Sequence, residues 1–241
     1  SEDYEERTEA RNQLRLGFAE AEGDSYEAFE QAVLDYSQGT LPLEERLYLL
    51  KLIGLFGTEA SVAPVAAMLA HENVNIRDSA RRALSSIPED AAARALALGL
   101  RKASSEDKPL FFDALAYRKE PRAVAIIAAE LKNPKLSRHA AVALGKIGSV
   151  DAIPSLLNGV QEGVEDVLEF EVALLRIGVD AQLARRLVEK GSQESICVDA
   201  FRQLSQQDSK GAGEVLGSLL KDPSARARSA IISEVWLLDV P

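Results

Sequence analysis

The sequence predicts an all-α fold built from repeated pairs of helices. Aromatic residues make up only 5% of the 241 residues and hydrophobic residues 46%, and this Ala- and Leu-rich composition suits close helix packing better than a sheet. Apolar residues recur at helical spacing in segments of about 12 residues. Short turns rich in Asn, Asp, Pro and Gly separate these segments.

An Ala-Leu or Ala-Phe pair recurs along the chain and indicates an internal repeat. Successive pairs are 31, 29, 30 and 27 residues apart, which gives a period near 30 residues. Each period divides into two amphipathic segments, which we expect to form two antiparallel helices joined by a tight turn. The pairs are Ala83-Leu84, Ala114-Leu115, Ala143-Leu144, Ala173-Leu174 and Ala200-Phe201.

The first helix of each pair follows an acidic or turn-forming start. Asp and Glu there suit the positive N-terminal end of a helix. We expect first helices within residues 58–71, 88–100, 120–132, 150–160, 180–191 and 208–221. The second helices carry the aligned pairs and follow polar turns such as Asn133-Pro134, where proline fixes φ and disfavours helix in the residue before it.

Proline and glycine positions agree with this division. Pro64 and Pro154 both fall inside predicted first helices and are 90 residues apart, three periods, so we expect two kinks in register. Gly57, Gly148 and Gly178 each follow the last apolar residue of a second helix. We expect all three to adopt the left-handed conformation that ends many helices.

Residues 1–56 differ from the repeats in charge and composition. Residues 1–46 hold 13 acidic and 4 basic side chains, a net charge of −9 out of −10 for the whole chain. Seven of the thirteen aromatic residues also lie in residues 1–56. A terminal repeat must cover its open apolar face, so we expect residues 1–56 to form a helical cap. The alternative is a separate interaction module in which Tyr26 and Tyr36 are exposed.

The stretch 122–160 resembles a HEAT-like repeat of the kind described in phycobilisome lyases. It has an Ala-Val first helix, the Asn133-Pro134 turn, an arginine, and the second-helix pattern Ala-Ala-x-Ala-Leu-Gly-x-Ile-Gly. The resemblance is good over 58–190, looser over 191–241 and poor before residue 45. It implies a right-handed α-solenoid of about six to seven HEAT-like pairs, with residues 57–241 continuing the cap as one domain.

In such solenoids the second helices line the concave side, where partners are usually held. Positions two residues after each aligned Leu or Phe, and others one or two turns earlier, lie away from the core. We therefore predict a partner-binding ridge of mixed charge, and the alternative is an ordinary solvated face. The residues are Arg82, Asp113, Tyr117, His139, Lys146, Glu169, Arg176, Asp199 and Gln203, with Ser86 at the equivalent position of its own repeat.

Catalytic and metal-binding patterns are weak. His71 and His139, the two histidines, fall in different repeats without cysteine or histidine at ligand spacing, so we expect no metal site. No Ser-His-Asp set is positioned by the pattern. Cys197 lies in an apolar helical pattern, where a buried core residue is the simpler interpretation. We expect no cofactor, and the sequence favours a protein that is not an enzyme.

Charge and hydropathy limit the partners. An acidic chain repels phosphate backbones and anionic lipids, and no run of 18 apolar residues occurs, so we expect neither nucleic acid nor membrane as partner. We expect a cytoplasmic protein, although a start at Ser1 leaves open a removed signal or anchor. The apolar segment 224–241, with Trp236, suggests self-association, a chain that continues, or a helix folded back onto the stack.

Three functions follow from these observations. The first is a non-catalytic scaffold or adaptor that binds another protein or peptide on the concave face. The second, implied by the resemblance, is a bilin lyase subunit acting on a phycobiliprotein, which would bind a bilin and change its absorbance. The third is a DNA glycosylase of the HEAT-like class, which would need a basic channel and show salt-dependent binding to duplex DNA.

Overall fold

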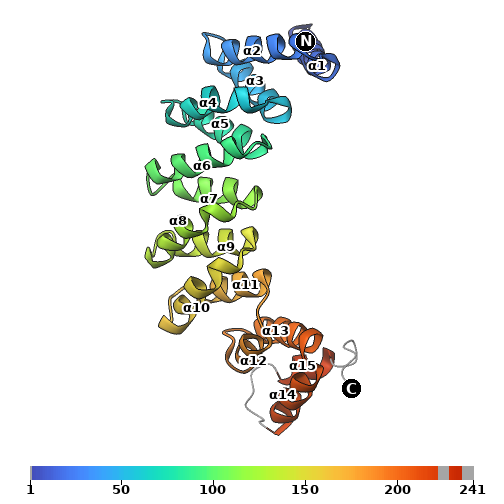
Figure 1. The fold of residues 1–241 in the computed structure, drawn as a ribbon, viewed down its shortest axis with the longest axis vertical. Coiled ribbons are helices and arrows are strands. Elements are labelled where there is room, and N and C mark those ends of the chain that lie inside the picture. The colour runs from blue at the N-terminus through green and yellow to red at the C-terminus, as the bar shows by residue number, and fades with distance from the viewer. Residues whose placement is uncertain (1, 222–227, 235–241) are drawn as a thin grey trace. The chain divides into compact units, whose positions relative to one another are not determined.

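The computed structural model describes residues 2–221 and 228–234, where every regular element is a helix. Turns and loops separate fifteen α-helices and four short 3-10 helices in these ranges, which contain no strand (Figure 1). The all-α prediction is therefore confirmed. The chain divides into two compact units, residues 1–118 and 119–241. The predicted boundary between a cap at 1–56 and a solenoid at 57–241 stays a prediction.

The first unit holds seven α-helices and one 3-10 helix. Within it, α3 packs on α5 and α5 on α7, while α4 packs on α6, so the predicted first and second helices form separate layers. The helices are α1 (Glu2–Glu20), α2 (Asp24–Gln38), α3 (Leu43–Phe56), α4 (Glu59–Ala67), η1 (Met68–Ala70), α5 (Val74–Ser86), α6 (Asp90–Lys102) and α7 (Lys108–Tyr117).

The second unit holds the other helices. Here α9 packs on α11 and α11 on α13, which again are predicted second helices, and η3 packs on α10. The helices are η2 (Pro121–Ala123), α8 (Val124–Ala128), η3 (Ala129–Lys132), α9 (Ser137–Ile147), η4 (Val150–Ala152), α10 (Ile153–Glu162), α11 (Val167–Ile177), α12 (Ala181–Lys190), α13 (Glu194–Gln207), α14 (Ser209–Lys221) and α15 (Arg228–Glu234).

The repeated pairs form the centre of the core. All ten residues of the five aligned pairs are buried, and none is more than 7% exposed. In the stretch 133–148, Ala140, Ala143, Leu144 and Ile147 are buried as the helical spacing predicts. Cys197 is also a buried free thiol, as expected. The sequence period therefore corresponds to equivalent buried positions.

Polar residues begin many helices, as predicted. Thr58, Asn73 and Ser149 accept hydrogen bonds from backbone N–H groups two residues later, at 3.2, 2.9 and 3.4 Å. Asp180 and Asp208 accept from the N–H groups of Leu183 and Gly211 at 2.7 and 2.8 Å. These side chains satisfy N–H groups that the first helical turn leaves without an intrahelical partner.

Aromatic side chains of the first three helices gather around Phe18. Its ring stacks on Phe56 with centroids 5.2 Å apart and meets Phe29 edge-on at 4.7 Å. Tyr26 lies half-buried at the rim, and its hydroxyl donates to the Phe56 carbonyl oxygen. The alternative interpretation of residues 1–56 as an interaction module expected both Tyr26 and Tyr36 to be exposed, and the structure exposes only Tyr36.

Two expectations about proline and glycine residues are corrected. Pro64 is inside α4, but Pro154 is in the first turn of α10, where a missing N–H group breaks no helical hydrogen bond, so no interior kink forms there. Gly148 is left-handed, with φ of 77° and ψ of 17°. Gly178 has a positive φ of 92°, but its ψ of 122° lies outside the left-handed region, and Gly57 has φ of −62° and is extended. Position 57 favours glycine because a side chain does not fit there: a Cβ atom would lie 2.4 Å from the Ile53 carbonyl oxygen.

The structure describes only part of the apolar C-terminal segment 224–241. Helix α15 covers Arg228–Glu234, and Ile231 within it is buried. Residues 222–227 and 235–241, including Trp236, lie outside the described residues. Self-association through the apolar end therefore stays a prediction.

Candidate functional site

Three predicted ridge residues of the first unit line one open groove between α5 and α7. The groove has a volume of about 290 Å³, and Arg82, Asp113 and Tyr117 all contribute to it. We call it the 78–117 groove; its lining is Asp78, Arg81, Arg82, Ser85, Leu110, Asp113, Ala114 and Tyr117. The Tyr117 side chain is 74% exposed, so an aromatic ring stands in solvent at the groove.

Ion pairs within α5 fix the charged side of the 78–117 groove. Both Arg81 and Arg82 reach the Asp78 carboxylate, with 2.9 Å between Arg82 Nε and Asp78 Oδ2. The guanidinium of Arg81 also lies 6.0 Å from the centroid of the Phe111 ring. Two arginines on one carboxylate leave the α5 side with a net positive charge, opposite the exposed aromatic ring on α7.

Three predicted ridge residues of the second unit line an equivalent groove between α9 and α11. This groove has a volume of about 320 Å³ and includes Lys146, Glu169 and Arg176. We call it the 138–176 groove; its lining is Arg138, Val142, Lys146, Leu168, Glu169, Val172, Ala173 and Arg176. An ion pair joins the two helices, with 3.0 Å between Arg138 Nε and Glu169 Oε1.

The other three predicted residues line neither groove. His139 is exposed on α9, and Asp199 is exposed on α13, where its carboxylate accepts from Arg202 at 2.7 Å. Gln203 is half-buried: its Nε2 donates to the Leu175 carbonyl at 2.7 Å, and its Oε1 accepts from the Val179 N–H at 3.4 Å. The Gln203 amide thus connects α13 to the end of α11.

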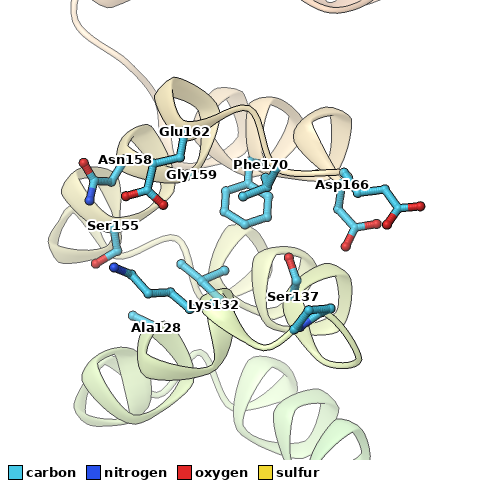
Figure 2. Close-up of a pocket in the computed structure, with 13 residues that line it drawn as sticks. Ala128, Lys132, Ser137, Ser155, Asn158, Gly159, Glu162, Asp166 and Phe170 are labelled. Atoms are coloured by element: carbon cyan, nitrogen blue, oxygen red, sulfur yellow. The ribbon is translucent and has the colours of Figure 1, made fainter.

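A larger cavity in the second unit was not predicted from the sequence. It has a volume of about 420 Å³ and lies where the η3–α9 turn meets α10 and the loop before α11 (Figure 2). We call it the 128–170 cavity; its lining is Ala128, Leu131, Lys132, Pro134, Ser137, Ser155, Asn158, Gly159, Glu162, Val164, Glu165, Asp166 and Phe170. None of the predicted ridge residues belongs to it.

The base of this cavity depends on a glycine. Gly159 of α10 packs against the buried Phe170 ring, and a Cβ atom at position 159 would lie 2.2 Å from Phe170 Cε1. Ala128 and Leu131 add apolar surface. The sequence signals are an interior helix glycine and the irregular segment 163–166, where Gly163 has φ of 67°. Neither signal shows that the two belong to one cavity.

The polar groups of the cavity are mostly acidic. Glu162, Glu165 and Asp166 lie along one wall and the loop beside it, and Lys132 is the single basic residue of the lining. Figure 2 shows the Lys132 side chain extending towards Ser155, on the far side of the cavity from Asp166. The Ser137 hydroxyl points from the start of α9 towards Phe170 and Asp166 (Figure 2).

The described residues offer little for metal chemistry or membrane insertion. No group of three or more His, Cys, Asp and Glu side chains in them is placed to hold a metal ion. His71 serves local structure, since its Nδ1 accepts from the Asn73 N–H at 3.0 Å. No helix in the described ranges is both long and apolar enough to cross a membrane.

Comparison with known proteins identifies no family. No family model matches the chain, and no curated protein matches it. Among solved structures, the chain is similar to a crystal structure described as an engineered protein, with 19% sequence identity and a TM-score of 0.37. The match covers 93% of this chain and 97% of that one. A TM-score of 0.37 is too low to establish a common fold.

Proposed function

We propose that the chain is a non-catalytic protein-binding scaffold that holds a protein or peptide partner on its second-helix faces. One observation carries the proposal: six of the nine predicted ridge residues line grooves between neighbouring second helices, three in each unit. A functional surface placed at equivalent positions of a repeat is what binding by repeat proteins requires.

The chemistry of the grooves suits a protein surface. Interfaces are enriched in tyrosine and arginine, which bury much area while keeping a polar group for hydrogen bonding. The 78–117 groove combines exposed Tyr117 with Arg81 and Arg82, and the 138–176 groove combines Arg176 with Lys146 beside Val142. Such a surface can bind an extended or helical segment with acidic and apolar side chains.

We also propose that the helix pairs are HEAT-like repeats of an α-solenoid. Support comes from the equivalent burial of the aligned pairs and from the separate layers of first and second helices within each unit. A reducing compartment such as the cytoplasm suits a chain with one buried cysteine. We expect the partner to be a protein or peptide.

Site-specific photo-crosslinking tests the scaffold proposal. A photoreactive phenylalanine analogue is placed at Tyr117 or Arg176, and as a matched control at Leu98, an exposed residue of α6 outside both grooves. Discrete protein adducts are expected from positions 117 and 176 and not from 98. Adduct formation at 117 should fall about five-fold when Arg82 is changed to Glu, because a negative charge at position 82 weakens the binding of an acidic partner.

A different outcome would remove the proposal. If neither groove position gives a protein adduct while native mass spectrometry finds a tightly bound small molecule, the scaffold function is wrong. Adducts that form equally from position 98 would show nonspecific contact and would also count against it.

A further inference from the structure

The 128–170 cavity has a buried serine in its lining. Ser137, the first residue of α9, is 4% exposed. Its backbone N–H donates to the Asn133 carbonyl at 2.8 Å. The Ser137 hydroxyl is not one of the fully buried side-chain atoms that lack a hydrogen-bond partner. Because the hydroxyl points into the cavity (Figure 2), a ligand there can form a hydrogen bond with it.

The acidic side of the cavity favours a cation. Glu165 and Asp166 lie on the loop before α11, and Glu162 lies in the last turn of α10, which holds no basic residue. The C-terminal end of a helix carries partial negative charge, which attracts cations. Figure 2 shows the Glu162 carboxylate beside Asn158, on the side of the cavity towards which the single basic lining residue, Lys132, extends. The acidic end near Ser137 is therefore formed by Glu165 and Asp166.

The apolar base requires that the cation be carried on a hydrocarbon stem. Phe170 and Leu131 are buried beneath the cavity, and Ala128, Pro134 and Val164 are the apolar lining residues that stay accessible, a surface that a bare ion would not use. Arginine and lysine side chains bury their methylene stems against apolar surface and keep the charged group at polar partners. The volume of about 420 Å³ lies within the range of sites that hold small ligands and is ample for one such side chain.

We infer that the 128–170 cavity binds an arginine or lysine side chain of a partner protein. The stem lies on the accessible apolar lining of Ala128, Pro134 and Val164, and the cationic group contacts Glu165 and Asp166. The Ser137 hydroxyl accepts a hydrogen bond from the cationic group. A guanidinium suits this end especially well because its planar N–H groups can reach a carboxylate and a hydroxyl together. This inference rests on the proposed scaffold function for its choice of a protein as the source of the cation.

The test uses the full-length chain labelled with ¹⁵N and a titration with N-acetyl-L-arginine methylamide. The amide signals of Ser137, Gly159 and Gly163 report on the cavity. Saturable shifts with a dissociation constant of about 1 mM are expected, since a single side chain supplies about 4 kcal/mol. The neutral isostere N-acetyl-L-citrulline methylamide should bind about ten-fold more weakly, because it lacks the charge that the carboxylates attract.

Variants assign the effect to named groups. The double change Glu165→Gln and Asp166→Asn should weaken arginine binding about five- to ten-fold, and Asn is tolerated where Asp166 precedes α11. Ser137→Ala should weaken it about three-fold. Glu189→Gln, at an exposed residue of α12 outside the cavity, is the matched control and should leave binding unchanged. Unaltered amide signals of second-unit residues outside the cavity show that each variant is folded.

Three results would overturn the inference. These are equal shifts with the citrulline compound, binding that the double variant does not weaken, and about ten-fold tighter binding of n-butylguanidine, which would assign the cavity to a free organic cation. The crosslinking experiment uses positions 117 and 176, which lie outside the cavity. Failure there would remove the scaffold proposal, whereas failure of the titration would remove only the assignment of the cavity.

Discussion

Gly145 of α9 lies directly against Ala173 of α11, because a Cβ atom at position 145 would be 2.8 Å from the Ala173 Cα atom. Gly54 of α3 has the same relationship to Ala83 of α5, at 3.0 Å. In both cases the glycine faces the alanine of an aligned pair on the next second helix. The close approach of neighbouring second helices therefore depends on a missing side chain at equivalent positions of each unit.

The change Gly145→Ala is expected to destabilise the protein. Alanine gains about 1 kcal/mol of helix propensity over glycine, but forcing a methyl group against the α11 backbone costs about 1 to 3 kcal/mol. We expect a net loss of about 1 kcal/mol in the free energy of unfolding, measured by urea denaturation. The control is Gly213→Ala in α14, where a Cβ atom meets nothing within 4 Å.

Opposite signs for the two alanine variants are the decisive result. Gly213→Ala should raise stability by about 0.5 to 1 kcal/mol, because it reduces the entropy of the unfolded chain without a clash. If Gly145→Ala is as stabilising as Gly213→Ala, then α9 and α11 do not approach as closely as described.

The repeat was predictable because the same positions of each helix pair are buried and therefore carry apolar residues. The aligned Ala-Leu pairs, the helix starts and the Asn133-Pro134 turn all follow from local rules of periodicity and turn chemistry. The same pattern extends further than we predicted: Leu52-Ile53-Gly54 in α3 matches Ala143-Leu144-Gly145 in α9. The larger residues of α3 obscured this match, since the repeat pattern was defined by an alanine in each pair.

Contacts between distant residues could not be predicted in the same way. The positions of the six ridge residues beside the grooves follow from helix geometry alone, whereas the grooves themselves were not predicted. The 128–170 cavity was not predictable, because it needs the irregular loop 163–166 and the packing of Phe170 on Gly159, which no spacing rule gives. Gln203 was placed on the ridge by the same geometry, but its amide bonds backbone groups of Leu175 and Val179.

Arg118 makes a second kind of long-range contact, with the turn that ends α5. Its guanidinium donates to the carbonyl oxygens of Leu84, Pro88 and Glu89 at 3.0, 3.1 and 3.0 Å, and it also contacts that of Ile87. A positive charge at the C-terminal end of a helix is stabilising as well. The Arg118 side chain therefore connects the end of α7 to the end of α5 and the turn that leads into α6.

Replacing Arg118 by methionine should destabilise the protein by about 2 to 3 kcal/mol, because hydrogen bonds from a charged group are lost and backbone carbonyls lose their partners. Chemical denaturation gives the value. Arg118→Lys, which keeps the charge but offers fewer donors in fixed directions, should be intermediate. Arg101→Met, at an exposed residue of α6, should change stability by less than about 0.5 kcal/mol; equal effects at 101 and 118 would contradict the role of Arg118.

Glu171 is a buried carboxylate that holds the start of α13. It is 2% exposed, and both its oxygens accept from the Ser192 N–H at 3.0 Å, with the Ser192 hydroxyl also bonded. Glu171→Leu removes the carboxylate that accepts from the Ser192 N–H and hydroxyl and should cost about 2 to 3 kcal/mol. Glu171→Gln keeps one acceptor oxygen and should cost about 1 kcal/mol less. Equal losses for both variants in denaturation experiments would show that the hydrogen bond is unimportant.

Tyr26 and Tyr48 should make the protein sensitive to alkali. Burial raises the pKa of Tyr26 above the ordinary value of 10.0, and the nearby Glu30 and Glu89 carboxylates raise it further. Burial also raises the pKa of Tyr48, partly opposed by Arg11 and Arg15. In both cases the folded state favours the neutral phenol, which at Tyr26 donates to the Phe56 carbonyl oxygen and at Tyr48 to that of Arg11, at 2.6 Å.

The sign of the pH dependence follows from these raised pKa values. A group that binds its proton more tightly in the folded state contributes stability below the unfolded pKa of about 10, and this contribution is lost as the pH rises through the folded pKa. The wild type should therefore lose stability as the pH rises above about 10. Thermal unfolding at a series of pH values measures the loss, and the ultraviolet absorbance of phenolate follows ionisation.

The variants Tyr26→Phe and Tyr48→Phe separate this effect from general alkaline denaturation. Each should be about 1 kcal/mol less stable than the wild type at pH 8, because a hydrogen bond is lost. Each should lose less further stability above pH 10, because phenylalanine cannot ionise. The double variant should show the flattest curve of the series. If its stability falls with alkali as steeply as that of the wild type, then ionisation of Tyr26 and Tyr48 is not what weakens the fold.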